Sequence, residues 1–332
     1  MSIVFDLLHV AHLNFFKAAI EHLSRRHTVR VVIRDRGNLV KIARAELSLP
    51  FTVSGQHRQG AYKILGLAER VLSLVDFCKR SRAALLVSCG FYSAIAARIC
   101  GIHSVNFYDD LEYKLNFWPS YLFSHCFVLP KLLDVSGRNI VQYDGYKELA
   151  YLREFRPSTE VLGEYGLDAE GYVFVRHIAP ISLNYVRRRA AEMERAVQYA
   201  SRLGMPILAS IEPGTTLVGC DQTYRKLVEP CSDFHSLVYY SKLAISTGDT
   251  VAREASLLGV PTIYLGGRNM KINQDLIRAG AMVIPRPDTL LQEIGHCLAR
   301  TGERIAPEYS QWDDTTEVIV NTVESYLSSL GQ

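Results

Sequence analysis

Short apolar runs alternate with longer amphipathic segments along most of the chain. Ile3–Phe5, Val29–Ile33 and Ala84–Ser88 are apolar runs of strand length. Between the first two, Asn14–Leu23 carries apolar residues at the spacing of one helical face. Parallel strands need a crossover connection, which is usually a helix, so this alternation favours a parallel sheet. The pattern therefore predicts the α/β fold class.

The same alternation is clearest in the C-terminal half. Leu243–Ile245 is an apolar strand, Ser246–Thr250 is a turn of small residues, and a helix is expected over Val251–Leu258. After Gly259, the run Thr262–Leu265 is a second buried strand. This order defines a βαβ unit with a right-handed crossover. Its turn directs backbone N–H groups and the positive end of a helix dipole outward, where an anionic group can bind.

Three side chains of this unit suit a nucleotide. Thr247 and Thr250 place hydroxyls at the turn, and Glu254 lies about one helical turn inside the helix. A carboxylate there can accept hydrogen bonds from ribose hydroxyls while the helix N-terminus holds a pyrophosphate. A plain crossover with a capped helix has the same spacing, so the spacing alone leaves both interpretations open.

The segment from Gly248 to Pro261 resembles a nucleotide-sugar signature. Its run Gly-Asp-Thr-Val-Ala-Arg-Glu-Ala, with Leu-Gly-Val-Pro at 258–261, is similar to the signature of GT-B glycosyltransferases and UDP-N-acetylglucosamine 2-epimerases. It most closely resembles a poorly characterised, largely archaeal family with the form Gly-Gly-Thr-Met-x-Arg-Glu-Ala. In this chain Asp249 stands in place of the second glycine of that form. The resemblance covers nearly the whole chain. It implies a GT-B-like fold, in which two Rossmann-like domains face a central cleft.

The length of 332 residues accommodates two domains of roughly 150 residues each. We predict an acceptor domain at residues 1–150 and a nucleotide-sugar-binding domain at 151–310. Residues 311–332 are expected to form a last helix. In GT-B proteins the C-terminal tail returns to the first domain, so this helix is expected to pack there. The run Tyr143–Leu152 resembles a motif of the archaeal family almost residue for residue and is predicted to link the two domains.

The resemblance also implies a set of donor-binding residues. Arg176 follows a strand and suits a pyrophosphate, Phe234 would line the base pocket, and Asn273 and Gln274 would contact sugar hydroxyls. A salt-bridged Arg176 and a capped surface helix explain the same residues equally well. The predicted nucleotide-sugar-binding residues are Arg176, Phe234, Thr247, Gly248, Asp249, Thr250, Arg253, Glu254, Asn273 and Gln274.

The predicted catalytic residues lie at strand ends in the N-terminal half. His12 follows the first strand, where open α/β sheets bind ligands, and His-Leu-Asn-Phe-Phe resembles a His-x-His-Phe-Phe run of the archaeal family. A neutral imidazole can accept the proton of an acceptor hydroxyl, so His12 is the expected base. Asp6, Asp109 and Asp110 end neighbouring strands and are the alternative bases. Phe91 stands where the resemblance to non-hydrolysing epimerases would place an Asp, which weighs against their reaction.

These residues favour a glycosyltransferase that uses a UDP-sugar, such as a UDP-N-acetylhexosamine, in cell-surface polysaccharide or glycoconjugate synthesis. A hydrolysing UDP-N-acetylglucosamine 2-epimerase and a non-catalytic nucleotide-sugar-binding protein are the alternatives. We expect no metal and no cofactor, because the helix N-terminus and Arg176 can neutralise the departing diphosphate.

The composition of the chain limits the classes of partner and the cellular compartment that we expect. The net charge of +3, without a concentrated basic patch, is not that of a nucleic-acid-binding protein, so we expect no nucleic-acid partner. Seven cysteines without a Cys-x-x-Cys pair indicate a cytoplasmic protein without a zinc site. The basic margin of a predicted helix at Gly60–Arg82 and the aromatic run Phe117–Phe123 allow peripheral contact with a membrane. The expected partners are therefore a nucleotide sugar and a glycan or lipid-linked acceptor.

Overall fold

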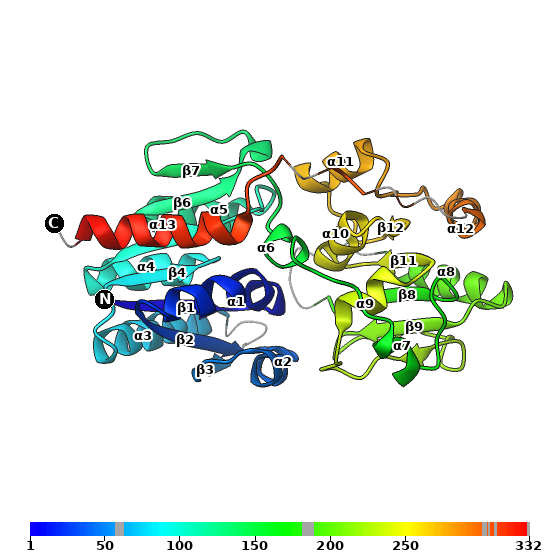
Figure 1. The fold of residues 1–332 in the computed structure, drawn as a ribbon, viewed down its shortest axis with the longest axis horizontal. Coiled ribbons are helices and arrows are strands. Elements are labelled where there is room, and N and C mark those ends of the chain that lie inside the picture. Colours follow the sequence, from blue (N-terminus) through cyan, green and yellow to red (C-terminus); the bar gives the residue numbers. More distant parts are fainter. Residues whose placement is uncertain (57–62, 181–188, 301–303, 305, 309–310, 331–332) are drawn as a thin grey trace. The chain divides into compact units, whose positions relative to one another are not determined.

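The computed structural model describes residues 1–56, 63–180, 189–300, 304, 306–308 and 311–330, which form two compact units (Figure 1). Unit 1 consists of Met1–Arg153 together with Ser310–Gln332, and unit 2 consists of Glu154–Tyr309. Each unit has its own parallel β-sheet with helices on both faces. The predicted α/β class with two Rossmann-like domains is confirmed.

Unit 1 contains a seven-stranded sheet in the order β3-β2-β1-β4-β5-β6-β7, and every neighbouring pair is parallel. Its strands are β1 (Ser2–Leu7), β2 (Thr28–Asp35), β3 (Phe51–Gln56), β4 (Leu85–Ser88), β5 (His103–Phe107), β6 (Cys126–Pro130) and β7 (Ile140–Tyr143). The chain leaves β1 toward one edge and returns through β4 toward the other. The strand order therefore reverses between β1 and β4, where open α/β sheets form a crevice at the carboxyl ends of their strands.

The helices of unit 1 cover the two faces of this sheet. They are α1 (Val10–Ser24), α2 (Leu39–Glu46), α3 (Lys63–Arg80), α4 (Phe91–Cys100), α5 (Lys114–Phe123), α6 (Leu149–Leu152) and α13 (Thr315–Leu330), with a short 3₁₀ turn at Lys131–Leu133. Alternate strand residues point to opposite faces, so Phe5 packs against Phe16 of α1 while Val4 joins the core beneath α3 and α4. Helix α13 lies beside α1 on the first of these faces (Figure 1).

The residues that helix α3 buries differ from the predicted ones. Arg70, expected on a solvated basic margin, is almost fully buried and pairs with the carboxylate of Asp6 on β1. Ser93 of α4 donates a second hydrogen bond to that carboxylate, at 2.6 Å. Leu72 of the same helix is 63% exposed. The first predicted residues, 60–62, lie outside the described residues. Asp6 is therefore fully buried, with both carboxylate oxygens bonded to protein groups, which argues against its predicted role as a base.

Unit 2 contains a five-stranded parallel sheet in the order β10-β9-β8-β11-β12. Its strands are β8 (Val173–His177), β9 (Ile207–Ile211), β10 (Arg225–Lys226), β11 (Leu243–Ser246) and β12 (Thr262–Tyr264). Its helices are α7 (Glu160–Glu164), α8 (Ala190–Arg202), α9 (Phe234–Tyr239), α10 (Asp249–Leu257), α11 (Lys271–Arg278) and α12 (Leu290–Ala299). Helices α8 and α12 pack on one face of the sheet, and α7, α9 and α10 pack on the other.

Two predictions can be compared directly with this arrangement. The predicted βαβ unit is confirmed as β11, α10 and β12. The apolar pattern of the segment from Tyr185 to Leu203 also predicts a helix; the structure describes it from Ala190 to Arg202, and residues 185–188 lie outside the described residues. Among the helices that the structure describes, none has the length and apolar character needed to cross a membrane.

Candidate functional site

The turn between β11 and α10 is fixed by its own hydrogen bonds. Ser246 Oγ accepts from the backbone N–H of Gly248 at 3.0 Å, and Thr247 Oγ1 accepts from the N–H of Ile178 at 3.0 Å. A Cβ atom at Gly248 would lie 2.9 Å from Ile178 Cγ2, so a larger residue here would displace the Ile178 side chain. The Thr247 hydroxyl thus holds the turn against the end of β8. Thr250, half-buried in the first turn of α10, completes the predicted anion-binding end.

Asp249 is held by protein groups rather than presented to a ligand. Its carboxylate accepts from Arg268 Nη1 at 2.8 Å and from Asn273 Nδ2 at 3.4 Å, and the Tyr264 hydroxyl donates a third hydrogen bond. Burial would raise the pKa of Asp249, but the charges of Arg268 and Arg253 outweigh it, so the pKa lies below its usual value. The carboxylate therefore stays ionised at the N-terminus of α10, where the helix dipole also favours it.

The other predicted residues of α10 and α11 form a network around Asp249. Arg253 and Asn273 are both buried, and Arg253 Nε donates to Asn273 Oδ1 at 2.8 Å. Gln274 lies nearer the surface and donates to Asn269 Oδ1 at 2.6 Å. The structure thus brings together Asp249, Arg253 and Asn273, and it gives their side chains contacts within the protein.

Arg176 has the contact that its structural alternative, a salt bridge, predicts, and Phe234 packs within unit 2. Arg176 Nη1 lies 3.0 Å from Glu229 Oε1 and donates to Ser210 Oγ at 2.5 Å. The Phe234 ring packs edge-on against Phe174, with centroids 5.5 Å apart. Roles in pyrophosphate and base binding remain predictions for these two residues.

Glu254 is buried beside a histidine. Its Oε1 lies 3.4 Å from Nε2 of His235, the second residue of α9. The structure therefore places Glu254 next to the residue that follows Phe234, the predicted base-pocket residue. Its contact with ribose hydroxyls remains a prediction.

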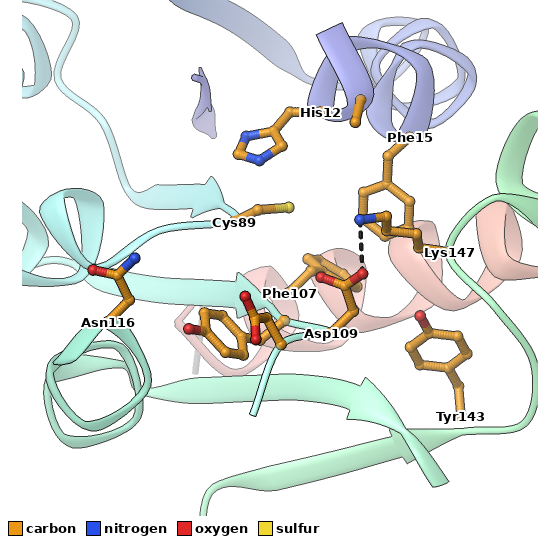
Figure 2. A pocket seen from close by; sticks show the side chains of 11 residues that line it. His12, Phe15, Cys89, Phe107, Asp109, Asn116, Tyr143 and Lys147 are labelled. Atoms are coloured by element: carbon orange, nitrogen blue, oxygen red, sulfur yellow. Dashed lines mark ion pairs between the residues drawn. The ribbon is translucent and has the colours of Figure 1, made fainter. Parts of the chain in front are cut away.

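Unit 1 contains a cavity of about 180 Å³ within which the predicted catalytic residues meet (Figure 2). It lies at the carboxyl ends of β4 and β5 and the N-terminal end of α1, beside the strand-order reversal. Its lining residues are Ala11, His12, Phe15, Cys89, Phe107, Tyr108, Asp109, Asp110, Asn116, Tyr143 and Lys147. The cavity therefore combines an apolar wall of phenylalanines with carboxylate, ammonium, imidazole and amide groups.

The two carboxylates of this cavity have different surroundings. Asp109 Oδ2 lies 2.7 Å from Lys147 Nζ, and both side chains are partly buried (Figure 2). Asp110 Oδ1 accepts from the backbone N–H groups of Glu112 and Tyr113, at 3.0 and 3.4 Å. Asp110 thus stabilises the turn before α5, while Asp109 is the carboxylate that pairs with a cation of the cavity.

His12 has surroundings that do not suit the predicted base. Burial, with the positive charges of Lys147 and Arg36, lowers the pKa of His12 to about 3, although Asp109 opposes this shift. Its Nδ1 accepts a hydrogen bond from the backbone N–H of Leu8 at 3.3 Å. The nitrogen that could take a proton is already an acceptor for a backbone donor, and the ring resists protonation.

Lys147 is the site residue that sequence reasoning missed. It lies in the run Tyr143–Leu152, which was predicted to link the two domains. In the structure Tyr143 ends β7, Leu149–Leu152 forms α6, and Ala150 joins the core of unit 1. The linker prediction is therefore wrong for this run, and the motif resemblance expected from the sequence was the available signal for a site residue.

Within the described ranges, no group of three or more His, Cys, Asp or Glu side chains is placed to hold a metal ion. Burial raises the pKa of the Cys89 thiol far above its usual value, so this cavity residue remains protonated.

Known proteins resemble the chain in structure rather than in sequence. No protein-family model and no curated protein matches it. The UDP-N-acetylglucosamine 2-epimerase from Rickettsia bellii has a TM-score of 0.77 and 13% identity, covering 99% of this chain and 98% of that one. The UDP-GlcNAc 2-epimerase from Neisseria meningitidis bound to UDP-GlcNAc has a TM-score of 0.74 and 12% identity, covering 98% and 100%. The glycotransferase of kitacinnamycin has a TM-score of 0.56 and 10% identity, covering 96% and 94%. These similarities establish a GT-B-like α/β fold.

Proposed function

We propose that the protein binds a UDP-N-acetylhexosamine and breaks the bond between the sugar and UDP, acting as a 2-epimerase of the hydrolysing type. The similarity to 2-epimerases over almost the full length of both chains carries this proposal. A further structure in this group, the UDP-GlcNAc 2-epimerase of Methanocaldococcus jannaschii in complex with UDP-GlcNAc and UDP, has a TM-score of 0.73. The glycosyltransferase selected by the sequence pattern has weaker structural support, at a TM-score of 0.56.

Unit 2 would hold the nucleotide. The N-terminus of α10, with Gly248 and Thr250, is the proposed diphosphate site, and Glu254 is the proposed ribose ligand. Arg268 and Arg253 supply positive charge close to this helix end, since both act on Asp249. No metal or cofactor enters the proposal.

Unit 1 would supply the chemistry at the sugar. Inversion at C2 requires a proton to leave this carbon from one face and return to the other. Asp109 is the carboxylate available for this step, because Phe91 begins α4 where the resemblance to epimerases would place an Asp. The C1–O bond breaks with its electron pair going to UDP, and water then provides the C1 hydroxyl and the C2 proton.

Product analysis tests this function directly. Incubation of the protein with UDP-N-acetylglucosamine in heavy water is expected to release UDP and free N-acetylmannosamine that carries deuterium at C2. Mass spectrometry and proton NMR would identify both products. Free N-acetylglucosamine without deuterium would indicate simple hydrolysis, and an unchanged substrate would indicate no reaction, so either result would overturn the proposal. Recovery of the UDP-linked 2-epimer would replace the hydrolysing type with the non-hydrolysing one.

A glycosyltransferase with a lipid-linked acceptor is the second candidate. Helix α5 favours it, because Leu115, Trp118 and Leu122 are 73%, 52% and 62% exposed and lie along one helical face. Exposed apolar side chains in one group mark interaction surfaces, and a membrane that carries the acceptor fits such a face. This candidate predicts release of UDP only when a glycan or lipid-linked acceptor is added. Binding of UDP without products under either condition would favour a non-catalytic nucleotide-sugar-binding protein.

A further inference from the structure

The hydrogen bonding of His12 fixes which ring nitrogen carries the proton. A backbone N–H can only donate, and the N–H of Leu8 is directed at His12 Nδ1 at 3.3 Å. Nδ1 therefore presents its lone pair. A neutral imidazole has one protonated nitrogen, so the proton resides on Nε2.

The surroundings keep the ring in this neutral form. The ring lies in the cavity wall, where burial disfavours the imidazolium, and the charges of Lys147 and Arg36 add to this effect. His12 also lies in the first turn of α1, whose N-terminal end carries partial positive charge. Asp109 acts in the opposite direction, but the pKa still falls to about 3. The other ionisable lining groups are Asp110, bonded to backbone N–H groups, Cys89, whose raised pKa keeps it neutral, and the phenols of Tyr108 and Tyr143.

We propose that His12 is a hydrogen-bond donor to the bound nucleotide sugar through Nε2–H, and that Asp109 is the base of the same cavity. This inference rests on the proposed function. As the C1–O bond breaks, its electron pair moves to an oxygen of the substrate. The neutral imidazole donates a hydrogen bond to an oxygen that gains this charge, and it transfers no proton. A neutral histidine whose pKa is lowered at a helix N-terminus can polarise a substrate in this way.

Lys147 is a positioning residue in this scheme. Its ammonium lies 2.7 Å from the Asp109 carboxylate and orients it within the cavity (Figure 2). It also helps to keep His12 neutral, because among the neighbouring charges Lys147 has the largest effect in lowering the pKa of the ring. One cation thus supports both assignments, the carboxylate as proton acceptor and the imidazole as donor.

Two substitutions of His12 by amide side chains test whether this residue acts as a hydrogen-bond donor or as a base. His12→Gln places an amide N–H near the position of Nε2–H and cannot take up a proton at neutral pH. His12→Asn can retain an acceptor for the Leu8 N–H but loses the donor into the cavity. We expect His12→Gln to keep kcat within about tenfold of wild type, and His12→Asn to lose about 10²–10³ in kcat. Melting curves and UDP affinity measured on both variants show whether they fold. Equal and large losses of kcat in two folded variants would identify His12 as a base and overturn the assignment.

A second measurement requires no turnover. Nitrogen-15 NMR of the unliganded protein, with the His12 signals identified by their loss in His12→Asn, reports the protonation of each ring nitrogen. We expect a protonated Nε2, an unprotonated Nδ1 and no titration between about pH 5 and 8. A titration in that range, or a proton on Nδ1, would overturn the inference. If wild-type protein leaves UDP-N-acetylglucosamine unchanged, the proposed function fails, while the NMR result still decides the state of His12.

Discussion

Asp249 shows how one residue changes the electrostatics of a helix end. The archaeal form of the signature has glycine at this position, where a backbone can approach a diphosphate closely. A carboxylate at the same place would repel that anion. Here Arg268 pairs with it at 2.8 Å and Arg253 lies close enough to lower its pKa further. The pair of arginines leaves the first turn of α10 with a net positive environment.

Asp249→Asn should destabilise unit 2. Removing one partner of a buried ion pair typically costs about 3–5 kcal/mol, because the remaining charge is left uncompensated. Since the folded pKa of Asp249 is depressed, its contribution is present above the unfolded value of about 4 and is lost as pH falls through the lower folded value. Denaturant unfolding at pH 7 should therefore show the full difference, and this difference should shrink in acid. Asp275→Asn breaks the exposed pair with Arg278 and serves as the control, with an expected change below about 1 kcal/mol.

Glu254→Ala should weaken the binding of UDP. A hydrogen bond to a charged group contributes about 1.5–3 kcal/mol, so the dissociation constant should rise about tenfold to a hundredfold. His235→Ala removes the same 3.4 Å contact from the other side and leaves the carboxylate in place. Calorimetry should find a loss of affinity for Glu254→Ala that clearly exceeds the loss for His235→Ala. Similar losses for both would mean that Glu254 acts through its pair with His235.

At the scale of single elements, the local pattern predicted strands and helices but not the burial of every residue. A short apolar run identified β1, and the glycine turn identified α10, because both signals are local in the sequence. Arg70 was placed on a solvated margin, since a charged residue is buried only when a partner from another element is present. That partner, Asp6, belongs to a strand far away in sequence. Lys147 was missed for the same reason: it meets Asp109 only after β5 and β7 enter one sheet.

Helix α5 should contribute to any contact of the protein with membranes. Its exposed face combines Leu115, Trp118 and Leu122 with Lys114, which precedes Trp118 by one helical turn. Leu115→Ser with Leu122→Ser should reduce co-sedimentation with anionic liposomes, and added salt should reduce the binding of the wild-type protein. Leu72→Ser removes an equally exposed leucine from α3 and is the control. A loss of binding with Leu72→Ser alone would place the contact on α3, and recovery of the wild-type protein in the supernatant would exclude both helices.

At the scale of the whole molecule, α13 should determine the stability of unit 1. Its buried residues Ile319, Val323 and Leu327 belong to the same core as α1 and β1. Ile319→Ala should destabilise the protein by about 2–5 kcal/mol, because it leaves a cavity in this core. Ser325→Ala on the exposed side of the same helix should leave the melting temperature nearly unchanged. An unchanged melting temperature for Ile319→Ala would show that α13 is not part of the cooperative core.

The overall fold was more predictable than the chemistry that it supports. A structure with 13% identity has a TM-score of 0.77 to this chain, so the architecture depends on the order of strands and helices more than on individual residues. A substitution such as Phe91 for an expected Asp leaves that order intact. It nevertheless changes which group can move a proton, and this depends on the positions of a few atoms.

Unit 1 is built from two segments that flank unit 2 in the sequence, and this has a consequence for synthesis on the ribosome. All of unit 2 is translated as an uninterrupted segment, whereas unit 1 is incomplete until α13 has been translated after unit 2. Domains often fold in the order in which they are made, but here the unit that starts first is the last to be complete. During translation the surface of α1 that α13 later covers is exposed to solvent and to chaperones. Pulse proteolysis of stalled nascent chains should therefore find unit 2 protected while unit 1 is still cleaved.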